Sequence, residues 1–147
     1  ISSAEKIHIN NHMKAISVIR EIKEEEVEKH EVDLDKIQTY VKSTELNLKQ
    51  AIEGEMNEFK NMYKDYVKIA QKEGFDVAEL SFSLARKAEK KHAEAYKKYL
   101  KFLRKEKKVL FKKIYICQIC GNIEFDTLPD NCPVCDHSKQ FFKEIRL

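Results

Sequence analysis

Glycine, proline and cysteine are almost confined to one short segment of this 147-residue chain. Both prolines, one of the three glycines and all four cysteines fall within residues 117–135. The first 116 residues contain only Gly54 and Gly74, and no proline. Because glycine and proline interrupt regular structure, this distribution predicts a long helical domain at 1–110. At 111–147 it predicts a small module that needs more than an apolar core to hold it together.

Composition narrows the class of protein. Hydrophobic residues make up 42% of the chain, which is enough for a core. No stretch approaches the roughly 20 consecutive apolar residues of a membrane-spanning helix. The net charge is +3, from 28 basic and 25 acidic residues, and this balance favours neither nucleic acid nor a membrane surface as the main partner. No secretory signal is visible, so we expect a cytoplasmic protein.

The spacing of apolar residues predicts three long helices with apolar faces turned inward, which in the second and third helices include Tyr66, Ile69, Tyr99 and Leu103. The first runs from the start of the chain to about residue 22. The second begins at Ser43 or Thr44, either of which can cap a helix, and ends at Gly74, and the third begins near Asp76. The linker at 23–42, with its solvated acidic run, is long enough to cross the whole bundle. It would make the second helix parallel to the first, whereas the short turn before Asp76 makes the third antiparallel to the second.

Carboxylates occupy positions on the apolar faces of these helices. They form pairs spaced three residues apart, so that both members share a helix face: Glu5 with His8, Glu55 with Glu58, and Glu89 with His92. A charged carboxylate in a bundle core costs several kcal/mol unless a cation accompanies it, and these faces carry no matching set of Lys or Arg. Two Glu-x-x-His pairs with further glutamates match the ligands of di-iron and di-manganese bundles. The pattern predicts a two-metal site, which suits iron or manganese better than copper.

The evidence for this site comes from the whole set, because helices this rich in Glu and Lys supply a single Glu-x-x-His pair by chance. Tyr63 follows Glu55 by eight residues and is expected near the site, although a core tyrosine is the ordinary interpretation. Asn11 and His12 either orient a ligand or simply pack. Gly54 costs about 1 kcal/mol in a helix interior, which usually marks close packing or a site.

The cysteines form two tight turns, Cys117-x-x-Cys120 and Cys132-x-x-Cys135. This spacing can close a tetrahedral four-thiolate site around iron or zinc. Gly121 allows a positive φ after the first turn and Pro133 stiffens the second, so that backbone N–H groups can point at the sulfurs. Disulfides are the alternative, but these turns have poor geometry for bridging to each other. Short strands at 114–116, 123–125 and 141–145 can surround the metal.

The order of these motifs resembles the rubrerythrin family over nearly the whole chain. The matching features are the two Glu-x-x-His pairs, the run AIEGEMNE at 51–58 followed by Met62-Tyr63, and both cysteine turns. Residues 40–48 resemble the start of that family's third helix, and Phe141-Phe142 resemble its closing strand. The resemblance implies a ferritin-like helix bundle with a di-iron site, followed by a rubredoxin-like domain. It also implies a non-haem peroxidase, an oxidoreductase that reduces hydrogen peroxide to water.

The resemblance assigns roles to the predicted residues. It implies that the di-iron site delivers two electrons to peroxide, with zinc or manganese as alternative metals. The catalytic residues that the resemblance implies are Glu5, His8, Glu55, Glu58, Glu89, His92 and Tyr63, of which all but Tyr63 are also metal ligands. Glu58 and His8 are expected to trade places on one iron as the site changes charge. A mononuclear iron on Cys117, Cys120, Cys132 and Cys135 is expected to relay single electrons from a separate NAD(P)H-linked reductase or rubredoxin.

The family pattern also raises an expectation about assembly. The relay commonly reaches the di-iron site of a neighbouring subunit, so we expect a homodimer, with exchange of helices between subunits as one form. The family's first helix carries one more glutamate ligand and has no counterpart before Ile1. We therefore expect a segment to have been lost, or the site to be completed by another chain.

Two other functions fit parts of the sequence. A helical protein with a zinc ribbon could bind nucleic acid through the segment 104–113, which holds six basic residues. However, residues 117–147 contain five acidic and three basic residues, and an acidic ribbon suits phosphate poorly. Iron storage with ferroxidase activity is the second alternative, but it needs no four-cysteine relay. His30 and His137 are interpreted as surface residues.

Overall fold

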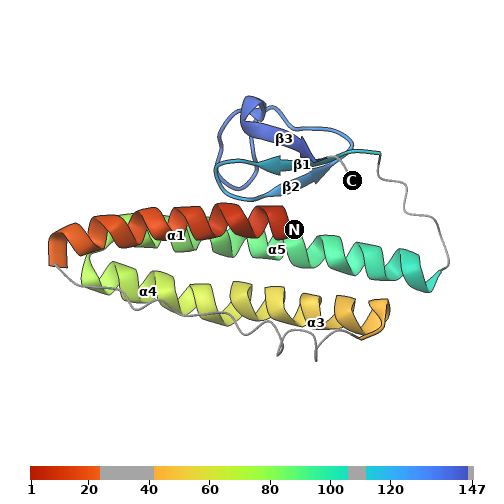
Figure 1. Cartoon of the computed structure of the whole chain (residues 1–147), viewed down its shortest axis with the longest axis horizontal. Coiled ribbons are helices and arrows are strands. Elements are labelled where there is room, and N and C mark those ends of the chain that lie inside the picture. The colour runs from red at the N-terminus through yellow and green to blue at the C-terminus, as the bar shows by residue number, and fades with distance from the viewer. Residues whose placement is uncertain (24–41, 106–111, 146–147) are drawn as a thin grey trace.

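The computed structural model describes residues 1–23, 42–105 and 112–145 (Figure 1). Its helices and strands follow in chain order: α1 (Ser2–Lys23), α3 (Thr44–Asn57), a π-helix (Glu58–Met62), α4 (Tyr63–Glu73), α5 (Asp76–Arg104), β1 (Ile114–Cys117), β2 (Ile123–Phe125), a 3₁₀ turn (Lys139–Phe141) and β3 (Phe142–Ile145). The predicted fold class, a helix bundle with a small C-terminal β module, is confirmed. No helix among the described residues is long and apolar enough to span a bilayer.

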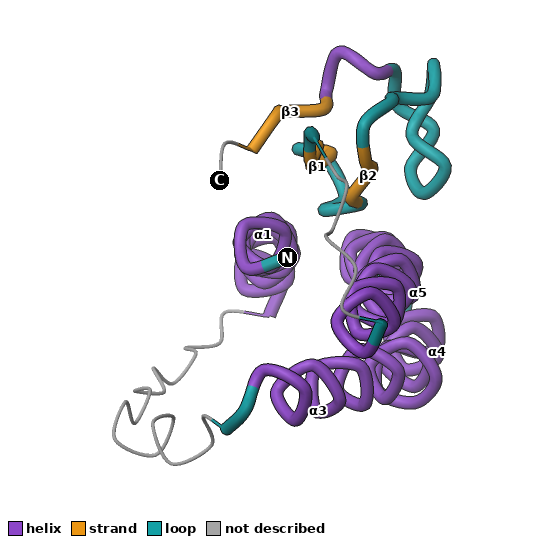
Figure 2. The backbone as a smooth tube through the Cα atoms, turned by 90° about the vertical axis from the view of Figure 1, so that its right-hand side faces the viewer, coloured by secondary structure: helices purple, strands orange, loops and turns teal. Residues whose placement is uncertain are grey.

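Helix α5 is the centre of the bundle. It contacts α1, α3 and α4, and it runs antiparallel to all three, which share one direction (Figure 1). The predicted helix directions are therefore confirmed. The predicted crossover linker, with its acidic run and His30, lies outside the described residues. Seen along the helices, the β module covers the side formed by α1 and α5, while α3 and α4 lie on the opposite side (Figure 2).

Local signals in the sequence set the helix ends. Ser43 Oγ accepts a hydrogen bond from the backbone N–H of Leu46 at 3.4 Å, the N-cap that was predicted. Gly74 ends α4 with φ of 74°, a left-handed conformation that glycine adopts without strain. The helix predicted across 43–74 is not continuous, because the π-helix at Glu58–Met62 interrupts it. Arg86 stabilises this wider turn, since its Nε donates to the backbone oxygen of Phe59 at 2.9 Å.

The cores of the two parts are small. Buried residues of the bundle are largely alanines, which let the helices approach closely: Ala4, Ala15, Ala70, Ala78, Ala85, Ala88 and Ala93. Four residues of the predicted apolar faces are instead 38–52% exposed: Tyr66, Ile69, Tyr99 and Leu103. Their prediction as core residues was wrong because spacing along a helix shows which residues share a face, but not whether another element covers that face.

The β module has a three-stranded antiparallel sheet with the order β2-β1-β3, and the predicted strands are confirmed. Three of its cysteines, Cys117, Cys120 and Cys132, form a buried cluster with Val134, and the partly buried Cys135 packs against it. A second cluster joins Ile116 and Ile123 to Ala4 of α1. The module therefore packs directly on the first helix, and this contact positions the cysteine turns beside the bundle's carboxylates.

Candidate metal centres

A cluster of acidic and imidazole side chains lies inside the bundle, supplied by three helices. Glu5 comes from α1, Glu55 from α3, and Glu89 and His92 from α5, and one potential ligand atom of each lies within 4.8 Å of all the others. Glu89 and His92 are fully buried, and Glu55 is 9% exposed. We call these four residues together with His8 the carboxylate site.

His8 and His92 turn the same ring nitrogen toward the carboxylates. Nδ1 of His8 lies 3.1 Å from Glu5 Oε2 and 3.0 Å from Glu89 Oε1. Nδ1 of His92 lies 2.8 Å from Glu89 Oε2 and 3.3 Å from Glu5 Oε1. The two rings stack with centroids 5.6 Å apart. Both imidazoles thus present one nitrogen to the same small volume between the glutamates.

The other nitrogen of each histidine contacts the cysteine module. Nε2 of His8 lies 3.1 Å from the backbone oxygen of Cys120, and Nε2 of His92 lies 3.0 Å from that of Gly121. A carbonyl oxygen only accepts hydrogen bonds, so both Nε2 atoms carry the proton. Metal-binding histidines typically donate their second N–H to a carbonyl or carboxylate in this way. The tautomer leaves Nδ1 of each ring available to a metal ion.

Several buried atoms of the carboxylate site have no hydrogen-bond partner among the described residues, despite their short contacts. They are Glu5 Oε1, Glu55 Oε2, both carboxylate oxygens of Glu89, and His92 Nδ1. One potential ligand atom from each of the four clustered residues lies within 4.8 Å of the others, so these atoms surround one small volume. Buried polar groups without partners are costly, and bound cations would satisfy all of them. The residues present therefore fit a di-iron-type site.

The pKa values of the glutamates and histidines show how the polypeptide alone balances the negative charge of the buried carboxylates. Burial favours the neutral form of Glu5, but His8 and His92 outweigh it and lower the pKa of Glu5 to about 2. Burial also opposes charge on the histidines, yet the neighbouring glutamates raise the pKa of His8 to about 9 and that of His92 to about 11. Without cations, the two protonated histidines balance part of the negative charge of the three glutamates.

Glu58 and Tyr63 lie at the edge of the site, on either end of the π-helix. Glu58 is half-buried and does not belong to the four-residue cluster. Burial and the charges of Glu89 and Glu55 raise the pKa of its carboxyl to about 7. Tyr63 is 7% exposed, and burial followed by the charges of Glu89 and Glu58 raises its pKa. A π-turn beside a cluster of this kind is typical of functional positions in helices.

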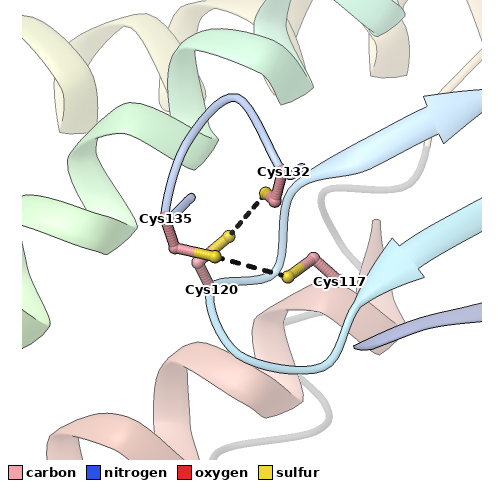
Figure 3. Close-up of side chains that lie close together, drawn as sticks. All are labelled: Cys117, Cys120, Cys132 and Cys135. Carbon is pink, nitrogen blue, oxygen red and sulfur yellow. Dashed lines mark hydrogen bonds between the residues drawn. The ribbon is translucent and has the colours of Figure 1, made fainter. Parts of the chain in front are cut away.

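The sulfur atoms of the four cysteines converge from two loops (Figure 3). Sγ of Cys117 lies 3.6 Å from Sγ of Cys135, and Sγ of Cys120 lies 3.6 Å from Sγ of Cys132. All four are free of disulfide bonds. Each turn is closed by a backbone hydrogen bond, from Gly121 N–H to Cys117 at 2.9 Å and from Asp136 N–H to Cys132 at 2.8 Å. The four residues together form a tetrathiolate-type site.

The local surroundings favour a thiolate at Cys132. Contacts with Cys117 and Cys120 lower the pKa of Cys132, and backbone N–H groups of Cys135 and Val134 add to this effect. These N–H groups face the sulfur, as the sequence predicted. Gly121 has φ of +77°, also as predicted.

Gly121 has a second role that the sequence did not reveal. A Cβ atom built on it would lie 2.6 Å from His8 Nε2 and 3.2 Å from the backbone oxygen of Ala4. A glycine here permits the cysteine turn to approach α1. Gly54 differs, because a Cβ there would meet none of the described residues within 4 Å and the residue is exposed. The prediction that Gly54 marks close packing was wrong. Gly54 is next to the site residue Glu55 in the sequence, but it makes no close contact itself with the other residues that the structure describes.

The two residues left open in the sequence have distinct contacts. Asn11 Nδ2 donates to the backbone oxygen of Ile119 at 2.8 Å, so Asn11 binds the module rather than a ligand. His12 contacts Ser81 and Tyr63. Ser81 was missed, and its only signal was a serine on the face of α5 that also carries Ala85 and Ala88. His137 is exposed, as predicted.

Comparison with known proteins places both parts of the chain in one family. The sequence model of rubrerythrin matches residues 1–100, and that of the rubrerythrin rubredoxin-like domain matches residues 115–143. Rubrerythrin-2 of Clostridium acetobutylicum is 35% identical over 97 residues, covering 66% of this chain and 53% of the relative. Rubrerythrin of Nitratidesulfovibrio vulgaris is 31% identical over 109 residues, covering 70% and 56%. The chain spans about half the length of these curated relatives.

Solved structures agree with the sequence comparison. A mixed-valence nigerythrin superposes with a TM-score of 0.79 at 30% identity, covering 97% of this chain and 65% of the other. A fully reduced, all-ferrous nigerythrin gives a TM-score of 0.78 at 27% identity, with the same coverage. Because the family model covers most of the chain and the four-cysteine module matches its companion domain, the chain belongs to the rubrerythrin family.

Proposed function

We propose that this chain acts as a non-haem di-iron peroxidase. Each hydrogen peroxide takes up two electrons and two protons and yields two water molecules. When bound, the iron pair would supply Lewis acidity and electrons at the O–O bond, and the four-cysteine iron would supply electrons singly. The proposed ligands of the pair are Glu5, His8, Glu55, Glu58, Glu89 and His92, and those of the single iron are Cys117, Cys120, Cys132 and Cys135.

The observation that carries this proposal is the contact between the two metal-type sites. The imidazole of His8 donates through Nε2 to the backbone oxygen of Cys120 at 3.1 Å. A path from the Cys120 sulfur to the carboxylate site therefore crosses one residue and one hydrogen bond. A relay of electrons needs such a connection, whereas iron storage does not. The contact favours the peroxidase over the storage protein.

The same contact weighs against a nucleic-acid-binding ribbon. The first cysteine turn lies against α1 and α5, where Asn11, His8 and His92 hold three successive backbone oxygens, those of residues 119–121. This turn is consequently not available as a recognition surface. A ribbon with more acidic than basic residues would also repel phosphate.

The contact between His8 and Cys120 supports a relay within one chain, and the expected homodimer would offer a second route, to the di-iron site of a neighbouring subunit. A homodimer remains part of the proposal, as do a separate NAD(P)H-linked reductase or rubredoxin as electron donor and the domain boundary near residue 110. Glu58 is half-buried and lies outside the four-residue cluster, so its carboxylate is not fixed among the converging ligand atoms. This property supports the proposal that Glu58 and His8 exchange as the charge of the site changes.

Rapid mixing of the fully reduced, iron-loaded protein with hydrogen peroxide tests the function. Peroxide should disappear with two electrons consumed per molecule, and the visible absorbance of the ferric cysteine site should rise in step. In Glu89→Ala the absorbance should rise far more slowly. Equal rates in both proteins would show that peroxide does not react at the carboxylate site, and an assembly that stores many irons per chain would favour the alternative.

A further inference from the structure

A row of three hydrogen-bonded side chains lies next to the carboxylate site. Nε2 of His12 lies 3.0 Å from the hydroxyl of Tyr63, and Nδ1 of His12 lies 2.8 Å from Oγ of Ser81. The three residues come from α1, α4 and α5 respectively. Both ring nitrogens of His12 are therefore engaged, and each joins α1 to a different helix.

The row is held in a tightly packed environment. Tyr63 and Ser81 are each 7% exposed, and His12 is half-buried. The ring of Phe82 lies 5.2 Å from that of His12 and 6.1 Å from that of Tyr63, measured between centroids. Aromatic contact restrains both rings, so the polar ends of the side chains have little freedom to reorient.

The direction of the hydrogen bonds follows from the neighbouring charges. After burial, the negative charges of Glu89, Glu58 and Glu5 have the largest effect on the pKa of Tyr63, so its hydroxyl lies within their field. That field favours a hydroxyl hydrogen that points toward the carboxylates. The Tyr63 oxygen then accepts from Nε2–H of His12, and Nδ1 accepts from the Ser81 hydroxyl. In this arrangement each donor faces the next residue of the row, from Ser81 to His12 and from His12 to Tyr63.

We propose that His12 is a positioning residue, which Ser81 orients and which holds the Tyr63 hydroxyl as a hydrogen-bond donor toward oxygen ligands at the carboxylate site. The functional part of this inference rests on the proposed peroxidase activity. Tyr63 is the group that would touch bound peroxide, and His12 acts only through it. Neither His12 nor Ser81 belongs to the residues that converge as metal ligands.

Nitrogen NMR tests the arrangement without catalysis. The protein is labelled with ¹⁵N-histidine and loaded with Zn²⁺ as a diamagnetic metal, and His12→Gln identifies the His12 signals by their loss. His12 should carry its proton on Nε2. Tyr63→Phe should shift the Nε2 resonance and Ser81→Ala the Nδ1 resonance. A proton on Nδ1, or an Nε2 resonance unchanged by Tyr63→Phe, would overturn the proposal.

Kinetics of the iron-loaded protein test the consequence. His12→Leu should lower kcat for peroxide by about tenfold with little change in KM. His12→Gln should recover most of that loss, because a carboxamide N–H can donate to Tyr63. In Tyr63→Phe, adding His12→Leu should cause no further loss, since both variants break the same contact. Additive losses would overturn a positioning role.

Ser17→Ala is the matched control, because Ser17 lies on the same helix as His12 and its exposed hydroxyl bonds only Met13 in the described contacts. It should leave both the NMR signals of His12 and kcat unchanged. If the unmodified protein does not reduce peroxide, the proposed function fails. The nitrogen resonances then still decide whether His12 holds Tyr63.

Discussion

At the scale of single residues, the two histidines of the carboxylate site each serve two neighbours. Nε2 of His8 and His92 donates to a backbone oxygen of the cysteine module, at 3.1 and 3.0 Å. Nδ1 faces Glu89 at 3.0 and 2.8 Å. Because the outer hydrogen bond fixes the tautomer, the inner nitrogen is prepared to bind a cation. The module thus helps to define the chemistry of a site to which it contributes no side chain.

Glu89 has the most buried carboxylate of the site, and both of its oxygens lack hydrogen-bond partners. Glu89→Ala should lower the rate of peroxide reduction by at least about 100-fold. Loss of a direct metal ligand should cost more activity than loss of a residue that only hydrogen-bonds to a ligand. The visible colour of the ferric cysteine site should persist. The control is Glu53→Ala, an exposed glutamate on α3, which should keep full activity. Full turnover in Glu89→Ala would remove the proposed site.

Metal loading should release protons. The metal-free histidines have pKa values of about 9 and about 11, above the ordinary value of 6.5, so both are charged at pH 7. Metal at Nδ1 must displace one proton from each, so the histidines contribute about two protons to the release, in addition to those from the cysteine thiols. Calorimetry in two buffers of different ionisation enthalpy measures this number. His8→Ala should reduce it by about one, and a pH-independent affinity would contradict the prediction.

The sign of the pH effect on stability follows from the same shifts. For the metal-free chain, the paired histidines contribute stability that is fully present below pH 6.5. That contribution is lost as the pH rises through about 9 for His8. Metal affinity changes in the opposite direction, because fewer protons compete for Nδ1 as the pH rises.

At the scale of elements, two glycines in the chain have different roles. Gly54 lies within α3, and a Cβ there would meet nothing within 4 Å in the part of the chain that the structure describes, whereas Gly121 has φ of +77° and lies against His8. The π-helix at Glu58–Met62 is a comparable local feature. It places Glu58 and Tyr63 at the edge of the site, and Arg86 satisfies the backbone oxygen of Phe59 beside it.

Gly121→Ala should weaken the docking of the cysteine turn. Its Cβ would meet His8 Nε2 at 2.6 Å, and the positive φ adds strain of about 1 kcal/mol or more. We expect lower stability in denaturant titration and slower electron transfer from the cysteine iron. Gly54→Ala is the matched control, and it should gain about 0.5–1 kcal/mol because alanine favours an exposed helix interior. Equal stability of the two variants would contradict the close approach at Gly121.

At the scale of the whole molecule, the β module and the bundle are joined by polar contacts as well as apolar ones. Ile116 and Ile123 pack on Ala4, and next to them the oxygens of residues 119–121 accept from Asn11, His8 and His92. The two metal-type sites are therefore neighbours within one chain. Two routes for electrons then need to be distinguished. One leads from the cysteine site to the carboxylate site of the same chain, and the other leads to the carboxylate site of a partner copy.

Mixing two defective variants distinguishes these routes. Cys132→Ala should block electron delivery while leaving iron in the carboxylate site, and Glu89→Ala should do the reverse. If the relay stays within one chain, a mixture that has been unfolded and refolded together should remain inactive. Recovery toward the quarter of activity that random pairing permits would show that the relay reaches a partner copy. Metal analysis of each variant alone serves as the control.

The sequence by itself determined the ligand types and the faces that carry them. A spacing of three residues puts Glu5 with His8 and Glu89 with His92 on one face of a helix, whatever that helix packs against. The cysteine turns and the caps at Ser43 and Gly74 were equally predictable, because they depend on residues a few positions apart. Burial of Tyr66 and Ile69 was not, because it depends on which other element covers them.

Only the tertiary structure decided how the two sites meet. The contacts of His8 and Asn11 with the module join residues about 110 positions apart and use backbone oxygens, which every residue possesses. Side-chain identity therefore carries no signal for them. For the same reason, the sequence did not show which of Gly54 and Gly121 lies in close contact with another element. It also did not show that Ser81 is the partner of His12. Which atoms become neighbours depends on how helices and sheet pack, and that packing is decided by the chain as a whole.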